Sequence, residues 1–513
     1  MMGTAHRQSI NKKSMKRINI FLGGLAALLL SSCFSDKSNY DYLQPVDIRV
    51  EGVDEAYTVS PTGDRLQINP KIYPDNRQYD CFWTVVPASA SWGDKPDTIS
   101  RNRNLDYAVN MNVGSYKMRF CAKDQETGVF AYEEYNLYVT TDMATGWWVL
   151  KSEGDSADVD FFAEKKTKLD VIQAANGRHL QGTAVDLYFN FSYWRFDEVN
   201  KRDKRGNAVF VASSKDLMAV DYFTGKTILD YDGLFIDKPA KREVHAMFAG
   251  PSDVHVYVDN TVYTLFFSRY DIYKQFILKS LGDYKLSPVR HAGNSLPLLF
   301  NEKNRSFCSV SRQSPRLDYF ADGVPSSKNM GMDLLFMGGL TTSAYTPGGV
   351  AMALMKKTDE EKYYLLTLNG QPSTMDLNPI SKMEEIDASL NVLKAKYRTL
   401  NQNNKILYYV KDNKLCTCNL ENMAEAEQNV SWPADERVTY MEYLKYSPYG
   451  QDSSWFDYLA VGTTRNGSYK LYLYPVSAGA VSPAVKVMEG KGEVKRASFM
   501  SQTSSGTYTS TLF

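Results

Sequence analysis

Histidine and cysteine, the residue types that most often bind transition metals, are scarce in this chain of 513 residues. It holds five histidines and six cysteines, and no histidine pair forms the His-Glu-x-x-His pattern of zinc peptidases. The Gly-x-Ser-x-Gly turn of α/β-hydrolases is also missing. Lysine plus arginine equals aspartate plus glutamate, 59 each, so the basic excess of a nucleic-acid-binding protein is missing too. These absences predict a protein with no catalytic residues, cofactor, metal site or nucleic-acid partner.

Long apolar runs are also missing, apart from one near the start of the chain. Residues 18–30 are apolar and follow Lys16 and Arg17, but the run is shorter than the roughly 20 residues that a membrane-spanning helix needs. A short apolar segment between basic and small residues is typical of a secretory signal peptide. We therefore assign residues 1–32 to a signal peptide. Five basic and no acidic residues lie there, so the mature chain carries a net charge of about −5.

The signal peptide ends in Leu30-Ser31-Ser32-Cys33, which resembles the lipobox of bacterial lipoproteins. The resemblance implies that Cys33 receives a diacylglyceryl group and becomes the acylated amino terminus. Each buried acyl methylene contributes about 0.8 kcal/mol, so several chains form a durable membrane anchor. The alternative is an ordinary signal peptide with an incidental cysteine. We expect lipidation, because Cys33 lies where cleavage is expected and polar residues follow it.

Residues 33–44 form a polar tether that contains Asp36 and Asp41. These early acidic residues resemble the export signal of Bacteroidota lipoproteins, which implies an outer-membrane protein facing the cell exterior. A plain solvated linker is the other interpretation, and both can hold together.

The aromatic fraction of 13%, with 35 tyrosines, is typical of β-rich secreted proteins. Residues 45–141 contain short strand-like runs about a dozen residues apart, which predicts an immunoglobulin-like sandwich with Trp83 in its core. Leu105-Asp-Tyr107, Gly114-Ser-Tyr116 and Asp124-x-x-Thr-Gly128 resemble the PKD-like domain of Bacteroidota lipoproteins. Such domains are usually spacers, so we expect no ligand there.

From residue 142 to 513 the sequence pattern changes to one of repeated hairpins. Apolar strands begin near residues 148, 209, 256, 307, 350, 407 and 458, at intervals of 43 to 61 residues. Such a period, with about four strands per unit, predicts a β-propeller. Turn residues such as Asp259-Asn260 and Asn466-Gly467 suit its hairpins. We predict an all-β protein in which a propeller of about seven blades follows the sandwich, with six or eight blades as alternatives. The competing architecture for residues 142–513 is two further sandwiches.

The propeller region also resembles the later part of PKD-like family lipoproteins, in Gly146-Trp147-Trp148, Gly467-Ser-Tyr469 and Gly490-Lys-Gly-Glu493. That family commonly accompanies SusC/SusD-type importers, in which a surface lipoprotein covers a TonB-dependent barrel. The resemblance implies a non-catalytic accessory or substrate-binding role in nutrient uptake, for peptides or otherwise glycans. It implies no catalytic residues.

Five cysteines follow Cys33, an odd number that cannot all pair. Cys81 and Cys121 share the predicted sandwich, and a bond between them stays open. Cys308, Cys416 and Cys418 are interpreted as small buried hydrophobic residues.

Two other motifs are rejected. Thr224-Gly-Lys-Thr227 lacks the first glycine of a phosphate loop, since Val220 stands at that position. Asp230-Tyr-Asp-Gly233 lacks the further ligands of a calcium loop. We expect a turn at the first and a loop at the second.

Binding residues are sought in three aromatic segments that read as loops, 189–196, 268–273 and 446–456. Aromatic rings with nearby charges can stack on sugars or hold a peptide, although large aromatic residues more often fill gaps between blades. The candidate ligand-binding residues are Trp194, Arg195, Tyr270, Tyr273, Tyr449 and Trp455.

The sequence thus predicts a lipid-anchored surface protein whose partners are a SusC/SusD-type importer and an oligomeric nutrient. The competing classes are a propeller hydrolase or lyase acting on extracellular polymers, and a purely structural subunit of the importer.

Overall fold

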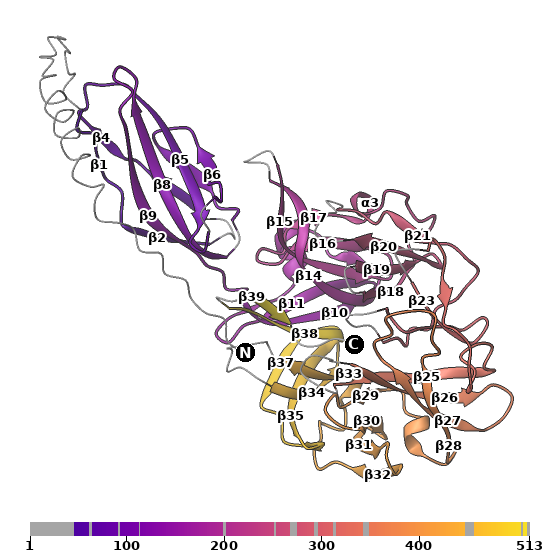
Figure 1. The fold of residues 1–513 in the computed structure, drawn as a ribbon. Coiled ribbons are helices and arrows are strands. Elements are labelled where there is room, and N and C mark those ends of the chain that lie inside the picture. The colour runs from indigo at the N-terminus through magenta and orange to yellow at the C-terminus, as the bar shows by residue number, and fades with distance from the viewer. Residues whose placement is uncertain are drawn as a thin grey trace, which may run out of the picture.

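The computed structural model describes residues 46–60, 64–90, 93–111, 113–197, 202–250, 253–266, 274–291, 296–310, 314–341, 348–446, 456–503 and 506–509. Strands make up nearly all of the regular secondary structure of these residues, together with the short helices α2 (Val171–Asn176) and α3 (Tyr231–Leu234) and the 3-10 helix η1 (Asn391–Leu393). The predicted all-β fold, a sandwich followed by a propeller, is confirmed (Figure 1). Among the described residues, no helix has the length and apolar character needed to cross a membrane.

The sandwich consists of a five-stranded sheet, ordered β2-β9-β8-β5-β6, and the pairs β1-β4 and β3-β7. Trp83 is fully buried in its core, with its ring centroid 4.7 Å from that of Phe120. The indole Nε1 donates a hydrogen bond to the carbonyl of Arg103 at 3.1 Å, which satisfies its only polar atom. The strands are β1 (Arg49–Glu51), β2 (Ala56–Val59), β3 (Arg65–Ile68), β4 (Lys71–Tyr73), β5 (Tyr79–Pro87), β6 (Asp97–Ser100), β7 (Leu105–Ala108), β8 (Gly114–Asp124) and β9 (Phe130–Val139).

The pairing between β5 and β8 settles whether Cys81 and Cys121 are bonded. Cys121 lies opposite Phe82, and Cys81 lies opposite Ala122. Neighbouring side chains of a strand point to opposite faces of the sheet, so the two sulfur atoms are on different faces. Both thiols are free, as are those of Cys308, Cys416 and Cys418, which are buried.

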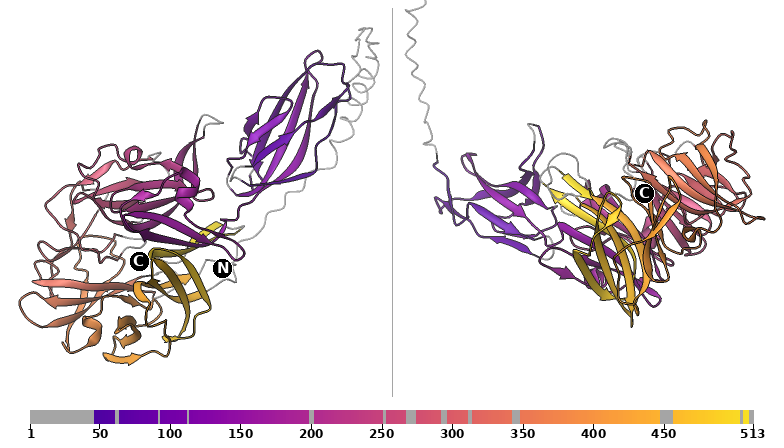
Figure 2. Two further views of the ribbon diagram at one scale, coloured as in Figure 1. Left: turned by 180° about the vertical axis from the view of Figure 1, so that it is seen from behind. Right: turned by 90° about the horizontal axis from the view of Figure 1, so that it is seen from below.

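After the sandwich, the described residues form seven sheets that follow one another around a ring in chain order, as the colours in Figures 1 and 2 show. The second sheet contains β14 (Ala184–Asp197), β15 (Arg202–Ser213), β16 (Leu217–Asp221) and β17 (Thr227–Leu229), and the third contains β18 (Val244–Ala249), β19 (Asp253–Val258), β20 (Thr261–Phe266) and β21 (Leu278–Ser280). The fourth sheet contains β22 (Leu299–Asn301), β23 (Ser306–Ser309) and β24 (Asp318–Tyr319), and the fifth contains β25 (Met332–Leu340), β26 (Val350–Lys357), β27 (Tyr363–Asn369) and β28 (Ile380–Ile386). The sixth sheet contains β29 (Arg398–Leu400), β30 (Ile406–Lys411), β31 (Lys414–Asn419) and β32 (Ala424–Glu427).

The last long strand closes the ring by joining the first sheet. That sheet has the order β12-β11-β10-β38-β39, so β38 is hydrogen-bonded to β10 along Thr145–Ser152. Its strands are β10 (Thr145–Glu153), β11 (Ser156–Phe162), β12 (Thr167–Lys168), β13 (Leu180–Gln181), β38 (Glu493–Thr503) and β39 (Gly506–Thr509). The seventh sheet contains β33 (Arg437–Tyr446), β34 (Phe456–Arg465), β35 (Ser468–Ser477), β36 (Ala480–Val481) and β37 (Lys486–Lys491).

Where a hairpin stands out in the sequence, it is formed by the second and third strands of its sheet, counted from the ring centre. The hairpins β15-β16, β19-β20 and β30-β31 are each preceded by a strand that borders the channel at the ring centre. The middle strands stand out because both of their faces are covered, so they read as continuous apolar runs. All residues of β16 and β19, for example, are buried.

The expectation that residues 189–196 form a loop is wrong, because they belong to β14 and pair with β15. Their alternating aromatic residues reflect a long hairpin. Thr224–Thr227 lies in the turn before and at the start of β17, as expected. At Asp230, where we expected a loop, the chain forms the short helix α3, and the Asp230 carboxylate caps it by accepting a hydrogen bond from the Gly233 amide at 3.0 Å.

Candidate functional site

The inner strands of the ring surround a channel of about 590 Å³. Strands β14, β18, β25, β29, β33 and β38 contribute to its lining, and Pro288–Arg290 lines it before the fourth sheet. A concave site of this size suits a small ligand or the end of an oligomer. Because six strands and the 288–290 segment supply the lining, side chains from the whole length of the propeller meet there.

Two carboxylates and two guanidinium groups form an ion-pair network in this channel. Asp186 pairs with Arg290, and its Oδ1 lies 3.4 Å from Nε of Arg496. Arg496 also donates from Nη1 to Glu442 Oε1 at 3.0 Å, while the hydroxyl of Tyr440 donates to Glu442 Oε2 at 2.6 Å. Each acid is thus engaged by a basic partner. Charges removed from water require such partners to be tolerated.

Burial and charge act in opposite directions on the two arginines. Burial lowers the pKa of Arg290, and Asp186 only partly opposes this effect. Burial also tends to lower the pKa of Arg496, but Glu442 and Asp186 hold it above its ordinary value. Both guanidinium groups remain protonated, because arginine does not lose its proton at physiological pH. The network therefore holds two positive and two negative charges.

Lys495 adds a positive charge that this network does not balance. It lines the channel on β38 beside Arg496, yet within the described residues no carboxylate lies within ion-pair distance of its ammonium group. The surrounding wall lowers the pKa of Lys495 through burial, and Arg290, Arg496 and Lys396 lower it further, against Asp186. Its side chain is nevertheless reached by solvent. Lys495 is therefore a cation that is available to a ligand from the channel.

Arg398 reinforces the positive character of the channel. Its Nε and Nη2 atoms each donate at 2.6 Å to the carbonyls of Val392 and Leu393, at η1. Burial lowers the pKa of Arg398 to about 10. The charged side chains that line the channel are then four basic and two acidic: Arg290, Arg398, Lys495 and Arg496 against Asp186 and Glu442.

A wider groove of about 930 Å³ adjoins the channel and shares Thr183, Ala184, Tyr397, Thr439 and Lys495 with it. Its rim contains charges of both signs that pair with one another. Arg437 pairs with Glu493, and Arg465 lies 2.7 Å from Asp435. The rim is therefore nearly balanced, whereas the channel has an excess of positive charge.

The groove opens on the side of the propeller opposite the sandwich. Strand β10 begins at Thr145, directly after the sandwich, and ends at Glu153 on the rim of the groove. On the sandwich side, the hydroxyl of Tyr222 donates to the Ala144 carbonyl at 2.7 Å. Burial raises the pKa of Tyr116 in the sandwich to about 12, and the positive charge of nearby Arg195 opposes that rise. The mouth of the channel thus points away from the N-terminal domain.

Of the residues predicted to bind ligand, the two that the structure describes, Trp194 and Arg195, do not line this channel. Trp194 stacks under Arg205, whose Cζ is 4.9 Å from the ring centroid, and Arg195 pairs with Asp221. Both are at the sandwich end of β14. Tyr270, Tyr273, Tyr449, Trp455 and the lipidation residue Cys33 lie outside the described residues.

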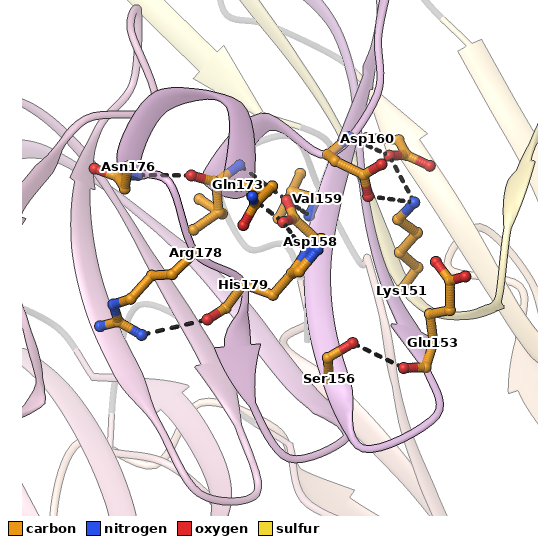
Figure 3. A network of polar contacts seen from close by, with 12 residues as sticks. Lys151, Glu153, Ser156, Asp158, Val159, Asp160, Gln173, Asn176, Arg178 and His179 are labelled. Atoms are coloured by element: carbon orange, nitrogen blue, oxygen red, sulfur yellow. Dashed lines mark hydrogen bonds and ion pairs between the residues drawn. The ribbon is translucent and has the colours of Figure 1, made fainter.

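A second polar network lies in the first sheet (Figure 3). Asp158, Asp170 and His179 form the one group of acidic, histidine or cysteine side chains in the described chain that is close enough to hold an ion. However, Asp158 accepts hydrogen bonds from the amides of Ile172 and Gln173 at 2.8 and 3.0 Å, and His179 Nδ1 lies 2.7 Å from its Oδ2. These contacts cap α2, so Asp158 has a structural role.

The fold and channel define an all-β protein in which a PKD-like sandwich carries a propeller. A model of the PKD-like family matches residues 33–184, which include the sandwich and the first strands of the propeller. Among curated proteins, none matches this sequence.

Solved structures resemble the chain at low identity, and two of them serve as examples. One is a quinonprotein alcohol dehydrogenase-like protein from Bacteroides thetaiotaomicron, with 11% identity, a TM-score of 0.37, and coverage of 86% of this chain and 96% of that one. The other is the WD40 domain of SCAP from fission yeast, with 10% identity, a TM-score of 0.32, and coverage of 63% and 81%. Neither likeness bears on activity.

The sequence reasoning missed the residues of the channel because they lie far apart along the chain. Asp186 and Glu442 come from two different sheets, Arg290 from the segment before the fourth sheet, and Lys495 and Arg496 from the closing strand. One signal was available. A charged residue within an otherwise apolar strand, such as Asp186 or Glu442, needs a buried partner.

Proposed function

We propose that this protein is a lipid-anchored, non-catalytic binding protein on the outside of the outer membrane, where it serves a SusC/SusD-type importer. In this proposal the propeller channel takes one end of an oligomeric nutrient. The observation that carries the proposal is the channel of about 590 Å³, which has surplus positive charge and opens away from the sandwich. An N-terminal lipid at Cys33 would hold the sandwich toward the membrane, so the channel would face the medium.

The chemistry of the channel favours binding over catalysis. A general acid or base needs a carboxylate that is free to exchange a proton with its substrate. Asp186 and Glu442 are both held by arginines, and Tyr440 also donates to Glu442. These contacts occupy the carboxylate oxygens that would transfer the proton.

The anchor is tested by replacing Cys33 with serine in the full chain expressed in a Bacteroidota host. Cys33→Ser is expected to abolish incorporation of labelled fatty acid and to move the protein from the membrane to the soluble fraction. Cys81→Ser, which removes a free thiol in the sandwich, serves as the control and is expected to change neither result. Unchanged labelling of the Cys33 variant would refute the anchor.

The partner is tested by affinity capture of the tagged protein from detergent-solubilised outer membrane. We expect a TonB-dependent barrel and its lipoprotein lid among the captured proteins. Capture without a barrel would count against the importer role. Turnover of a peptide or glycan mixture by the purified protein would overturn the non-catalytic assignment.

A further inference from the structure

The positive charge of the site is concentrated in the channel. The channel carries four basic and two acidic side chains, while the rim pairs Arg437 with Glu493 and Arg465 with Asp435. A polymer with a charge on every unit would be matched by a basic stripe along the whole groove. A single basic region confined to the channel instead fits a ligand that has one anionic end.

Lys495 is the group best placed to meet that end. Arg290 and Arg496 already hold carboxylates of the protein, whereas the Lys495 ammonium pairs with no described acid and is reached by solvent. A carboxylate next to Lys495 would gain a charge-assisted hydrogen bond. Arg290 and Arg496 would add attraction at longer range.

A second polar group in the channel also lacks a partner. Gln402 is 5% exposed and lines the channel, and its Oε1 has no hydrogen-bond partner among the described residues. A buried carbonyl oxygen without a donor costs free energy, so a ligand N–H at this position would be favourable. Phe336, Met337 and Met441 provide apolar surface in the same channel.

We propose that the channel binds the C-terminal end of a peptide, with its free carboxylate at Lys495, a backbone N–H directed to Gln402 and side chains against the apolar wall. This inference rests on the proposed function in one respect, that the channel is where the ligand binds. It adds the chemical class of the ligand and the direction in which the ligand enters.

The test measures retention of a synthetic hexapeptide pool by the immobilised full chain, with mass spectrometry as the readout. The same pool with C-terminal amides is the matched probe, and oligogalacturonate is the anionic glycan probe. We expect the free-acid pool to be retained at least about tenfold more than the amidated pool, because only the former carries the terminal charge.

The variants identify the residue responsible. Lys495→Met is expected to reduce retention of the acid pool about tenfold or more, and Gln402→Leu to reduce it several-fold. Lys382→Met is the control, since Lys382 is an exposed residue of β28 that pairs with Glu384 at 2.7 Å. Thermal unfolding of each variant shows whether it is folded.

Each outcome separates this inference from the proposed function. Equal retention of the acid and amide pools, or an unaffected Lys495→Met variant, overturns the inference. Retention of oligogalacturonate alone, dependent on Lys495, overturns the peptide assignment but leaves ligand binding by the channel intact. Retention of none of the probes by the unmodified protein overturns both the inference and the channel as a binding site for these nutrients.

Discussion

The hydroxyl of Tyr469 on β35 donates a hydrogen bond to Oδ2 of Asp160 on β11 at 2.7 Å, although 309 positions separate the two residues. Asp160 also lies 3.1 Å from the ammonium of Lys151 and accepts a hydrogen bond from the Asp170 amide at 2.8 Å. The pair connects the seventh sheet to the first. It therefore reinforces the seam that β38 closes.

Removing Asp160 should destabilise this seam strongly. Lys151 is 2% exposed, and loss of one partner of a buried ion pair typically costs about 3–5 kcal/mol. Asp170, which lies 2.8 Å from Lys151, should reduce that cost, so we expect Asp160→Ala to lower the free energy of unfolding by about 2–4 kcal/mol. Tyr469→Phe, which removes only one donor, should cost about 1–2 kcal/mol. Urea denaturation measures both values.

A double variant checks the origin of the effect. Lys151→Met together with Asp160→Leu replaces the ion pair with apolar side chains, and such exchanges are often neutral. The double variant should therefore be more stable than Asp160→Ala alone. Equal or lower stability would show that the seam does not depend on the uncompensated Lys151 charge.

Deleting residues 493–513 should open the ring. The deletion removes β38, which supplies the backbone partners of β10 from Thr145 to Ser152, and leaves a long unpaired strand edge that promotes aggregation. We expect loss of the cooperative thermal transition of the propeller and a larger apparent size in gel filtration. Deleting only residues 504–513 retains β38 and should preserve the transition. An intact transition after the longer deletion would argue against the closure.

Acid should destabilise the protein through His291. This side chain is 1% exposed, Nε2 lies 3.1 Å from the Gly348 carbonyl, and burial lowers its pKa to about 4. The unfolded chain binds the proton near pH 6.5, so stability is fully present above that pH and is lost as the pH falls toward 4. The loss should reach about 3 kcal/mol.

The contribution of His291 is isolated by comparison with His291→Gln. Urea denaturation between about pH 7 and pH 4 should give a flatter profile for this variant than for the unmodified protein, even if its stability at neutral pH is lower. His245→Gln, at an exposed position, is the matched control and should keep the original slope. Parallel profiles for all three proteins would refute the prediction.

Replacing Lys495 should stabilise the fold even though we expect it to weaken binding. The pKa of Lys495 is lowered mainly by burial, so its charged form costs free energy at every pH below that lowered value. The cost disappears as the pH rises past about 10.4, where the unfolded chain also loses the proton. Because solvent reaches the side chain and screens part of this cost, Lys495→Met should raise Tm by about 1 °C or less near neutral pH, with a smaller difference above pH 10. A lower Tm near neutral pH would contradict this prediction.

Much of the fold could be predicted because its signals are local. Alternation and turn residues mark the strands, and the doubly covered middle strands, such as β19, produce the repeat of the propeller. Trp83 was placed correctly in the sandwich core because a tryptophan in an alternating strand has few other favourable positions. The segment around Trp194 was misinterpreted as a loop, because a long hairpin has the same aromatic content as an exposed loop.

The sequence by itself determined the strand content, the repeat and the presence of a separate N-terminal sandwich, since each depends on residues within a few positions of one another. Only the tertiary structure decided the channel. Asp186, Arg290, Glu442 and Lys495 meet there because closure of β38 on β10 brings strands about 310 residues apart to a common axis. Charge balance at that axis depends on distances in space, and the linear order of residues does not contain them.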